Sequence, residues 1–223
     1  MTATAILPLP ASLGSAAVLT PVAGRSPLVR IVHGLSQAAS VVVGAASSLV
    51  VPVRELLIAE GFSDVPVRTA DAPGERAQCV AAALATSSPG TPVLVHDIGW
   101  PLVDPATAVR VLAALRDGAQ VVAPARPVTD SIKTVDRDGV VTATLDRAEL
   151  QVLQYPRGFD AEVLTRAVAG AVTDRGDELE IALAGGARIE LVDGDAAALG
   201  VELPRDAGFL AALIEDRRNG SSP

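Results

Sequence analysis

Lysine is almost absent from this chain of 223 residues: Lys133 stands alone beside 17 arginines. A mechanism that needs an ammonium group on a phosphate must therefore use Lys133, because the planar guanidinium of arginine replaces a compact point charge poorly. Lys133 lies in the segment PVTDSIKTVDRDG, residues 127–139. The sequence thus restricts lysine chemistry to one place in the chain.

Cysteine, aromatic residues and long hydrophobic runs are also scarce. Cys79 is the only cysteine, which excludes an internal disulfide and fits the reducing cytoplasm, where we expect the protein to reside. The longest apolar stretches, such as residues 41–53, are broken by Gly, Ser and Pro, so no membrane span is expected. The segment MTATAILPLP lacks a basic region, so no signal peptide is expected either. With 2% aromatic residues, the core must consist of Val, Leu, Ile and Ala.

Positive charge is not in excess. The formal net charge is −8 and the sequence pI is about 4.7. A protein that binds a nucleic acid backbone needs a basic surface, so nucleic acid is excluded as a partner. A local cluster of arginines could still hold a small anionic ligand.

The hydrophobic pattern alternates short β-branched runs with longer helical periods, which is typical of an α/β domain with a largely parallel sheet. Ser26-Pro27 and Asp104-Pro105 each pair an N-cap residue with proline at the first helical position, and Gly118 ends the second helix. We expect a Rossmann-like sheet in a single domain, 1–223. The expected strands are Ala3–Leu7, Ser40–Val43, Val65–Thr69, Val93–His96, Gln120–Ala123 and Arg188–Val192.

Residues 127–147 depart from this alternation of strand and helix patterns. Polar and β-branched residues alternate around Asp136-Arg137-Asp138-Gly139, which predicts a β-hairpin with a tight turn. A hairpin inserted in an α/β domain often projects from it as an arm. Its polar faces indicate packing against a partner subunit or a ligand.

Ligands of open α/β sheets bind beyond the carboxyl ends of the strands. Two segments are expected there, residues 7–27 after the first strand and residues 95–105 after the fourth. Asp97 directly follows the fourth strand, where its carboxylate could hold a divalent metal or a substrate hydroxyl. A turn or helix-cap role explains such an aspartate equally well.

Four segments resemble the 2-C-methyl-D-erythritol 4-phosphate cytidylyltransferases. VHDIGWPLV is similar to the family's VHDAARPLV-type strand and loop, and GERAQCVAAAL to its ERxxSVxxGL segment. PVTDSIKTVDRDGVVTATLDRAELQVLQYPRGF (127–159) resembles the family's PVxDTIK…TxDRxxLwxxQTPQxF. LVDGDAAALGVELPRDAGFLAALI (191–214) follows its closing V-x-G-D-x-x-N-x-K-x-T-x-P-E-D-L pattern. The resemblance covers most of the chain and includes the predicted arm.

The resemblance implies an enzyme that transfers CMP from CTP to a sugar-alcohol phosphate, 2-C-methyl-D-erythritol 4-phosphate, with Mg²⁺, releasing pyrophosphate. It also implies a homodimer that exchanges its arms. Ser131, Lys133 and Arg147 would then reach the polyol phosphate of the neighbouring subunit, while Asp97 would act in its own subunit on substrate and metal. The positions expected at the nucleotide on the same ground are Ser12, Gly14, Ser15, Gly74 and Cys79.

Several positions depart from the family pattern. The family's glycine-rich AAGxGxR…PK loop corresponds to LPLPASLGSAAVL, where Pro8 and Pro10 lack N–H donors and no basic residue precedes Arg25. The arginine of HDxxRP corresponds to Trp100, and the lysine of the closing motif to Gly200. Gln-Thr-Pro-Gln appears as Gln154-Tyr155-Pro156-Arg157, and the serine of ERxxSV as Cys79. Arginines that could compensate for the missing basic residues are Arg25, Arg30 and Arg157.

Each candidate also has a structural interpretation. Cys79 is expected to behave as a small hydrophobe on an apolar helix face. His33 lies off the buried stripe of its helix and is expected in solvent, whereas His96 is expected to be packed at the end of a strand. Trp100 either fills the space of the missing arginine or offers a stacking platform for a base or sugar.

The charged residues have two interpretations as well. Asp193 and Asp195 could join Asp97 around a metal, or could form a turn that ends a strand. Lys133 could instead be a cross-strand charge partner of an aspartate in the arm, Asp136 or Asp130.

Three functions follow. The first is a cytidylyltransferase of this family with an altered phosphate site and impaired or altered activity. The second is a non-catalytic relative that keeps the fold and the arm as a binding or regulatory module. The third is a nucleotidyltransferase of the same fold that acts on another sugar phosphate.

Overall fold

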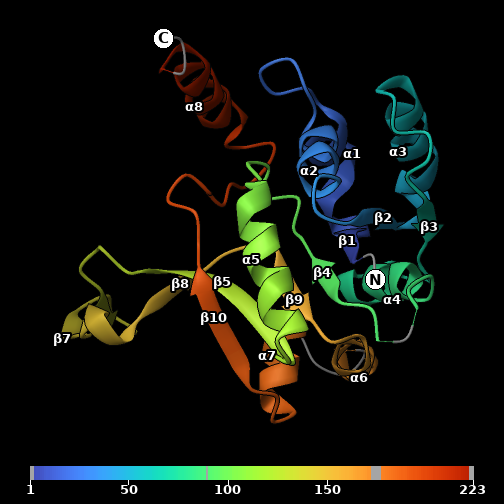
Figure 1. Ribbon diagram of the computed structural model, residues 1–223. Coiled ribbons are helices and arrows are strands. Elements are labelled where there is room, and N and C mark those ends of the chain that lie inside the picture. The colour runs from blue at the N-terminus through green and yellow to red at the C-terminus, as the bar shows by residue number, and fades with distance from the viewer. Residues whose placement is uncertain (1–2, 89, 172–176, 221–223) are drawn as a thin grey trace.

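The computed structural model describes residues 3–88, 90–171 and 177–220, and its centre is an eight-stranded mixed sheet (Figure 1). The strands run in the order β10-β5-β9-β4-β1-β2-β3, and β8 pairs with β5. β1 pairs in parallel with β2 and β4, and β10 pairs in parallel with β5. The strands of this sheet are β1 (Thr4–Leu9), β2 (Ser40–Ala45), β3 (Val67–Thr69), β4 (Val93–Val95), β5 (Val121–Pro127), β8 (Gln151–Leu153), β9 (Arg157–Phe159) and β10 (Ile189–Asp193). The predicted α/β class and the six predicted strands are confirmed.

Helices cover both faces of the sheet. One apolar cluster joins the sheet to α2, α3 and α5, through residues such as Leu28, Leu49 and Leu112. The second joins it to α4, α6 and α7, through Val80 and Leu164 among others. The helices are α1 (Gly14–Leu19), α2 (Pro27–Leu35), α3 (Ser47–Ala59), α4 (Arg76–Leu84), α5 (Pro105–Arg116), α6 (Ala161–Ala171), α7 (Glu178–Ala184) and α8 (Ala207–Gly220). Within the described ranges, no helix is long and apolar enough to cross a membrane.

The helix starts that the sequence predicts are confirmed. The Ser26 hydroxyl accepts a hydrogen bond from the backbone N–H of Val29 at 3.2 Å, and α2 begins at the following proline. The Asp104 carboxylate accepts from the N–H groups of Ala106 and Thr107 and caps α5. These two helices are therefore fixed by local side-chain bonds as well as by packing.

Strand β9 is not anticipated by the sequence pattern. It runs antiparallel between β4 and β5, with Phe159 opposite Val93 and Val121. Gly158 is required there, because a Cβ would lie 2.5 Å from Cγ1 of Val111 in α5. A segment of three residues that begins with an arginine is too short to show the alternation of apolar and polar residues that predicts a strand, so only the tertiary structure reveals this strand.

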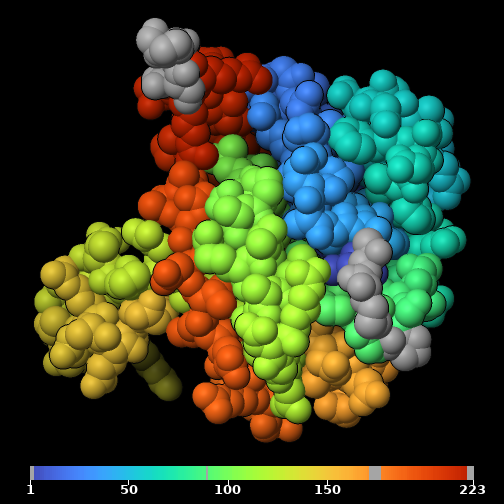
Figure 2. All heavy atoms as spheres, in the orientation of Figure 1, coloured from blue at the N-terminus to red at the C-terminus, as the bar shows by residue number. Residues whose placement is uncertain are grey.

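The arm consists of β6 (Lys133–Val135), β7 (Val141–Thr144) and the short 3-10 helix η2 (Arg147–Glu149), and it projects from the body of the molecule (Figure 2). β6 and β7 pair antiparallel, as the sequence indicates. The turn is held by the Asp136 carboxylate, which accepts hydrogen bonds from the N–H groups of Asp138 and Val140. Lys133 Nζ donates to Thr144 Oγ1 at 2.6 Å. Its cross-strand partner is thus a threonine, and no aspartate among the described residues forms an ion pair with it.

Candidate active site

Asp97 lies directly beyond the end of β4, and both its carboxylate oxygens are engaged. Oδ1 accepts a hydrogen bond from the N–H of Gly99 at 2.8 Å, and Oδ2 accepts from Nη1 of Arg76 at 2.6 Å. The Asp97 side chain remains 31% exposed. Each oxygen keeps a second lone pair, so the carboxylate is oriented but still open to a ligand on its solvent side.

Arg76 joins two acidic residues that are far apart in the sequence. Its Nε donates to Oε1 of Glu178 at 2.8 Å, and the Glu178 side chain is only 4% exposed. Burial alone would lower the pKa of Arg76, but the negative charges of Glu178 and Asp97 raise it above its ordinary value. Arg76 is therefore a permanent cation that balances a buried carboxylate and orients a partly exposed one.

Local structure places Arg76 at the first position of α4. Glu75 caps this helix, and the Gln78 side chain returns to accept from the N–H groups of Gly74 and Glu75, both at 2.8 Å. This capping box fixes the direction in which the Arg76 side chain leaves the helix. Arg76 belongs to the Glu75-Arg76 pair of the segment that resembles ERxxSV, and this pair is the feature of the sequence that marks it. The spacing alone predicts no contact between Arg76 and Asp97.

A ring of aromatic and cationic side chains surrounds Tyr155. The guanidinium of Arg157 lies over the Tyr155 ring, 4.3 Å from its centroid, and that of Arg76 lies at 5.8 Å. The rings of His96 and Trp100 contact Tyr155 at centroid distances of 5.8 and 5.9 Å. Burial raises the pKa of Tyr155 to about 12. The phenol is therefore neutral at physiological pH.

His96 is packed at the end of its strand, as predicted. It is 1% exposed, and its Nε2 lies 2.9 Å from the carbonyl oxygen of Trp100. Burial lowers its pKa to about 4. The imidazole is thus neutral and holds the loop that follows Asp97. His33, by contrast, is exposed, also as predicted.

Arg157 is not available to a phosphate in this structure. It is 8% exposed, pairs with the carboxylate of Asp177 and packs against Tyr155. Burial by itself would raise the pKa of Asp177, but the hydrogen bond from Arg157 and those from the N–H groups of α7 lower it. Of the three arginines proposed as compensating groups, Arg157 therefore has a structural partner already.

Trp100 and Gly200, two positions that depart from the family pattern, lie against each other. A Cβ on Gly200 would lie 3.1 Å from Cζ2 of Trp100, so only a residue without a side chain fits there easily. The N–H of Val201 donates to the carbonyl of Gly99 at 2.7 Å and joins the two segments. Trp100 thus occupies space beside the closing motif, which agrees with the space-filling interpretation.

The loop after β1 lies at the same edge of the sheet as Asp97, because β1 and β4 are parallel neighbours. It contains the 3-10 helix η1 (Ala11–Leu13), and the N–H of Ala11 donates to the carbonyl of Gly74 at 2.9 Å. Gly74 has φ +81°, and a Cβ there would meet the Cβ of Ala46 at 2.8 Å. Ser12, Gly14 and Ser15 are exposed on this loop. These residues lie at the predicted edge of the sheet, and their roles at a nucleotide remain predictions.

Cys79 is fully buried, as its hydrophobic interpretation predicts. The side chain has 0% exposure, and burial raises the pKa of its thiol to about 11. The sulfur therefore presents no surface to a nucleotide in this conformation. Any contribution of Cys79 to nucleotide binding comes from its packing.

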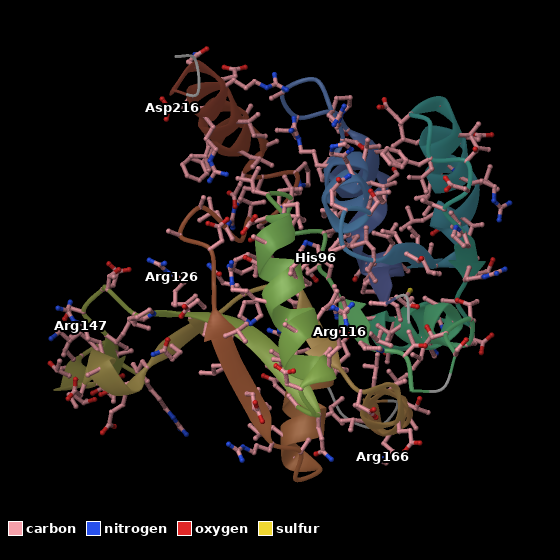
Figure 3. The ribbon with its side chains drawn as sticks, viewed as in Figure 1. His96, Arg116, Arg126, Arg147, Arg166 and Asp216 are labelled. Atoms are coloured by element: carbon pink, nitrogen blue, oxygen red, sulfur yellow. The ribbon has the colours of Figure 1, made fainter. Side chains whose placement is uncertain are left out.

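The arm residues lie apart from Asp97 within the same chain. Ser131 and Arg147 line a small hollow of about 400 Å³ on the arm, together with Thr144, Leu145 and Asp146. Arg147 donates to the carbonyl of Thr129, and Figure 3 shows it at the outer end of the molecule, far from His96. One chain alone does not bring Ser131, Lys133 and Arg147 to the carboxylate of Asp97.

Asp193 and Asp195 do not form a metal cluster with Asp97. Among the described residues, no group of three acidic, histidine or cysteine side chains could hold a metal ion by itself. Asp195 accepts from the N–H of Ala197, which is the turn interpretation of that residue. At Asp97 a divalent ion would need additional oxygen ligands from a substrate. Mg²⁺ is commonly bound in this way, by one or two carboxylates together with substrate phosphates.

The family model for 2-C-methyl-D-erythritol 4-phosphate cytidylyltransferase matches residues 14–216 of this chain. The chain belongs to this family. It is 38% identical over 195 residues to the 2-C-methyl-D-erythritol 4-phosphate cytidylyltransferase of Rhodococcus opacus, covering 86% of this chain and 84% of that one. Enzymes of the family depend on a divalent metal ion.

Solved structures of family members share the fold. The cytidylyltransferase from Thermus thermophilus superposes with a TM-score of 0.77 at 25% identity, covering 96% of this chain and all of that one. The synthase from Anaerococcus prevotii superposes with a TM-score of 0.78 at 19% identity, covering 96% and 98%. The second likeness concerns the fold alone.

Replacing Arg76 by glutamine should lower the free energy of unfolding by about 3 kcal/mol, because Glu178 then keeps a buried charge without its partner. Urea unfolding of Arg76→Gln measures the change. Arg205→Gln removes an exposed arginine with two acidic neighbours and should leave the stability unchanged. Equal effects of the two substitutions would contradict the buried role of Arg76.

Stability should fall as the pH is lowered from 6.5 to 4. In this window the unfolded chain binds a proton at His96, whose ordinary pKa is 6.5, but the folded chain with its pKa of about 4 does not. The loss should reach about 3 kcal/mol at the lower limit. His96→Gln should remove most of this slope, whereas His33→Gln should keep it. Identical slopes for the wild type and His96→Gln would show that His96 is not buried as a neutral base.

Proposed function

We propose that the chain transfers CMP from CTP to 2-C-methyl-D-erythritol 4-phosphate at a slow rate. The observation that carries this proposal is the orientation of Asp97: in a chain of this family, Arg76 and Gly99 hold the carboxylate at the end of β4 with one side open. The resemblance assigns Asp97 to substrate and metal.

In the proposed reaction an oxygen of the substrate phosphate attacks the α-phosphorus of CTP. A new P–O bond forms, the bond to the β-phosphate oxygen breaks in line, and pyrophosphate leaves. We infer that the metal is Mg²⁺, held by Asp97, and its charge would neutralise the phosphate oxygens. Asp97 would position this site, and the loop 11–15 would border the nucleotide.

Catalysis of this reaction depends on positioning and on charge neutralisation. Loss of one donor to the transition state typically costs about 3–4 kcal/mol, which is about 100- to 1000-fold in rate. The chain has Trp100 and Gly200 where the family pattern has an arginine and a lysine, and Pro8 and Pro10 in the phosphate loop. We therefore propose a rate well below that of relatives.

One observation favours the non-catalytic alternative. Trp100 is packed against Gly200, so an indole lies where these two positions of the family pattern, an arginine and a lysine, meet in this chain. A chain with this arrangement could keep the fold as a binding module without turnover. The alternative is an outcome of the activity test below.

We further propose that the arm pairs two copies of the chain and brings Ser131, Lys133 and Arg147 of one copy toward Asp97 of the other. The support is a set of apolar side chains that the arm leaves in solvent. On the arm these are Val135, Val140, Val141 and Leu145, which are 60%, 59%, 59% and 42% exposed, and Val152 of the adjoining β8 is 46% exposed. A patch of this kind is typical of an interaction surface. We place the homodimer in the cytoplasm, in line with the single reduced cysteine.

The proposed activity is measured as pyrophosphate released from CTP in the presence of 2-C-methyl-D-erythritol 4-phosphate and Mg²⁺. We expect a kcat/KM at least about 100-fold below that of the Rhodococcus opacus enzyme, because at least one phosphate-directed donor is missing. EDTA and Asp97→Asn should abolish the remaining activity, whereas Asp64→Asn, a change of an exposed aspartate, should not. Absence of turnover in the wild type, with no heat from CTP in calorimetry, would support the non-catalytic alternative instead.

Sedimentation velocity tests the proposed homodimer. The wild type should sediment as a dimer, and Val141→Asp should shift it toward the monomer because a charge would enter the apolar contact. Val51→Asp is the matched control, since Val51 is 58% exposed on α3, away from the arm. A monomeric wild type at tens of micromolar, or equal behaviour of the two variants, would refute assembly through the arm.

A further inference from the structure

A groove beside α2 and the loop 101–105 is lined by three arginines and a histidine. It has a volume of about 460 Å³ and is lined by residues of α2, of the loop 101–105 and of the C-terminal part of the chain. Arg25, Arg30, His33 and Arg217 are among its lining residues. We call it the arginine groove. It belongs to the side of the sheet covered by α2 and α5, whereas Arg76 and Glu178 begin α4 and α7 on the other side.

One strained turn brings Arg30 of the groove close to Arg218, which lies beside the groove. Nη2 of Arg30 donates to the carbonyls of Val22 at 2.7 Å and Ala23 at 3.0 Å, and Nη2 of Arg218 reaches the same Ala23 oxygen at 3.4 Å. Ala23 has φ +49°, a left-handed conformation that is rare for alanine. Figure 1 shows α8, which carries Arg218, beside the loop that leads into α2. Such strain persists only where surrounding contacts hold it, and it is often found at functional sites.

Two arginines that line the groove, Arg25 and Arg30, and the neighbouring Arg218 lack ion pairs among the described residues. Burial, followed by the neighbouring charges of Arg218 and Arg25, lowers the pKa of Arg30. Its Nε is buried and finds no hydrogen-bond partner among the described atoms. A buried donor on a cation that repels its neighbours is costly unless an anion accepts from it.

The acidic residues of the groove are engaged elsewhere. Asp104 accepts from the N–H groups of Ala106 and Thr107 as the cap of α5, and Asp195 accepts from the N–H of Ala197. Both carboxylates therefore stabilise backbone at the rim. They leave the guanidinium groups as the charged donors for a ligand.

We propose that the arginine groove is a second anion site, which binds a small molecule that carries a phosphate group. Guanidinium groups match the geometry of phosphate oxygens with paired donors, and the volume of the groove suits a small ligand. The site is separate from Asp97 and requires no turnover of CTP. Arg25 and Arg30, which the sequence offered as replacements for the missing basic residues of the phosphate site, line this groove instead.

Calorimetric titration with inorganic pyrophosphate, without metal and at low ionic strength, tests the groove. The wild type should bind, and the affinity should fall as salt is added. The double substitution R25Q/R218Q should weaken binding at least about tenfold, since each charge-assisted bond to phosphate contributes more than a neutral one. Arg30 is left unchanged because it donates two hydrogen bonds to the turn, whereas Arg218 adds one longer bond to Ala23. Thermal unfolding checks that the double variant is folded.

Two controls separate this site from other surfaces. Arg116→Gln changes an exposed arginine at the end of α5, labelled in Figure 3, and should bind pyrophosphate like the wild type. Asp97→Asn should also bind pyrophosphate in the groove with unchanged affinity. The groove is therefore tested independently of the proposed catalysis, even if the protein shows no turnover. No heat from the wild type at millimolar pyrophosphate, or binding by R25Q/R218Q within twofold of Arg116→Gln, would overturn the proposal.

Discussion

The buried charge of Glu178 is the constraint on which the candidate site depends. A carboxylate that is 4% exposed requires a cation, and Arg76 supplies it through a 2.8 Å hydrogen bond. Because the same guanidinium also binds Asp97 at 2.6 Å, the need to neutralise a buried acid fixes the position of a partly exposed one. The first turns of α4 and α7 and the end of β4 are thereby tied together at one point of the sheet edge. The site is oriented by the interior of the protein, before any substrate is present.

Four of the departures from the family pattern lie in contact with one another: Trp100, Tyr155, Arg157 and Gly200. Trp100 and Arg157 both contact the ring of Tyr155, and Gly200 leaves the space that Trp100 occupies. Arg157 in turn pairs with Asp177, the cap of α7, whose next residue is Glu178. The replaced side chains thus form one continuous set of contacts that borders Arg76. Asp97 itself is held by Arg76 and Gly99, so its orientation does not depend on the replaced side chains directly.

Much of the framework could be predicted from the sequence, because its signals are local. Ser26 and Asp104 cap the helices that they indicate, and Asp136 forms the turn of the predicted hairpin. The central features of the site depend instead on distant residues. Glu178 is 102 positions from Arg76 in the sequence. β9 forms a strand because it pairs with both β4 and β5, which lie on either side of it. No periodicity or spacing reports such contacts, so the roles of Arg76, Glu178 and Tyr155 emerged only from the structure.

A double-mutant cycle on Arg76 and Glu178 tests this account most directly. Unfolding free energies of the wild type, Arg76→Gln, Glu178→Gln and the double variant give the coupling between the two side chains. The account predicts a favourable coupling of about 2–3 kcal/mol, with the double variant more stable than Arg76→Gln alone because no buried charge remains. Additive effects, with no coupling beyond about 0.5 kcal/mol, would contradict it and would leave the orientation of Asp97 without its proposed cause.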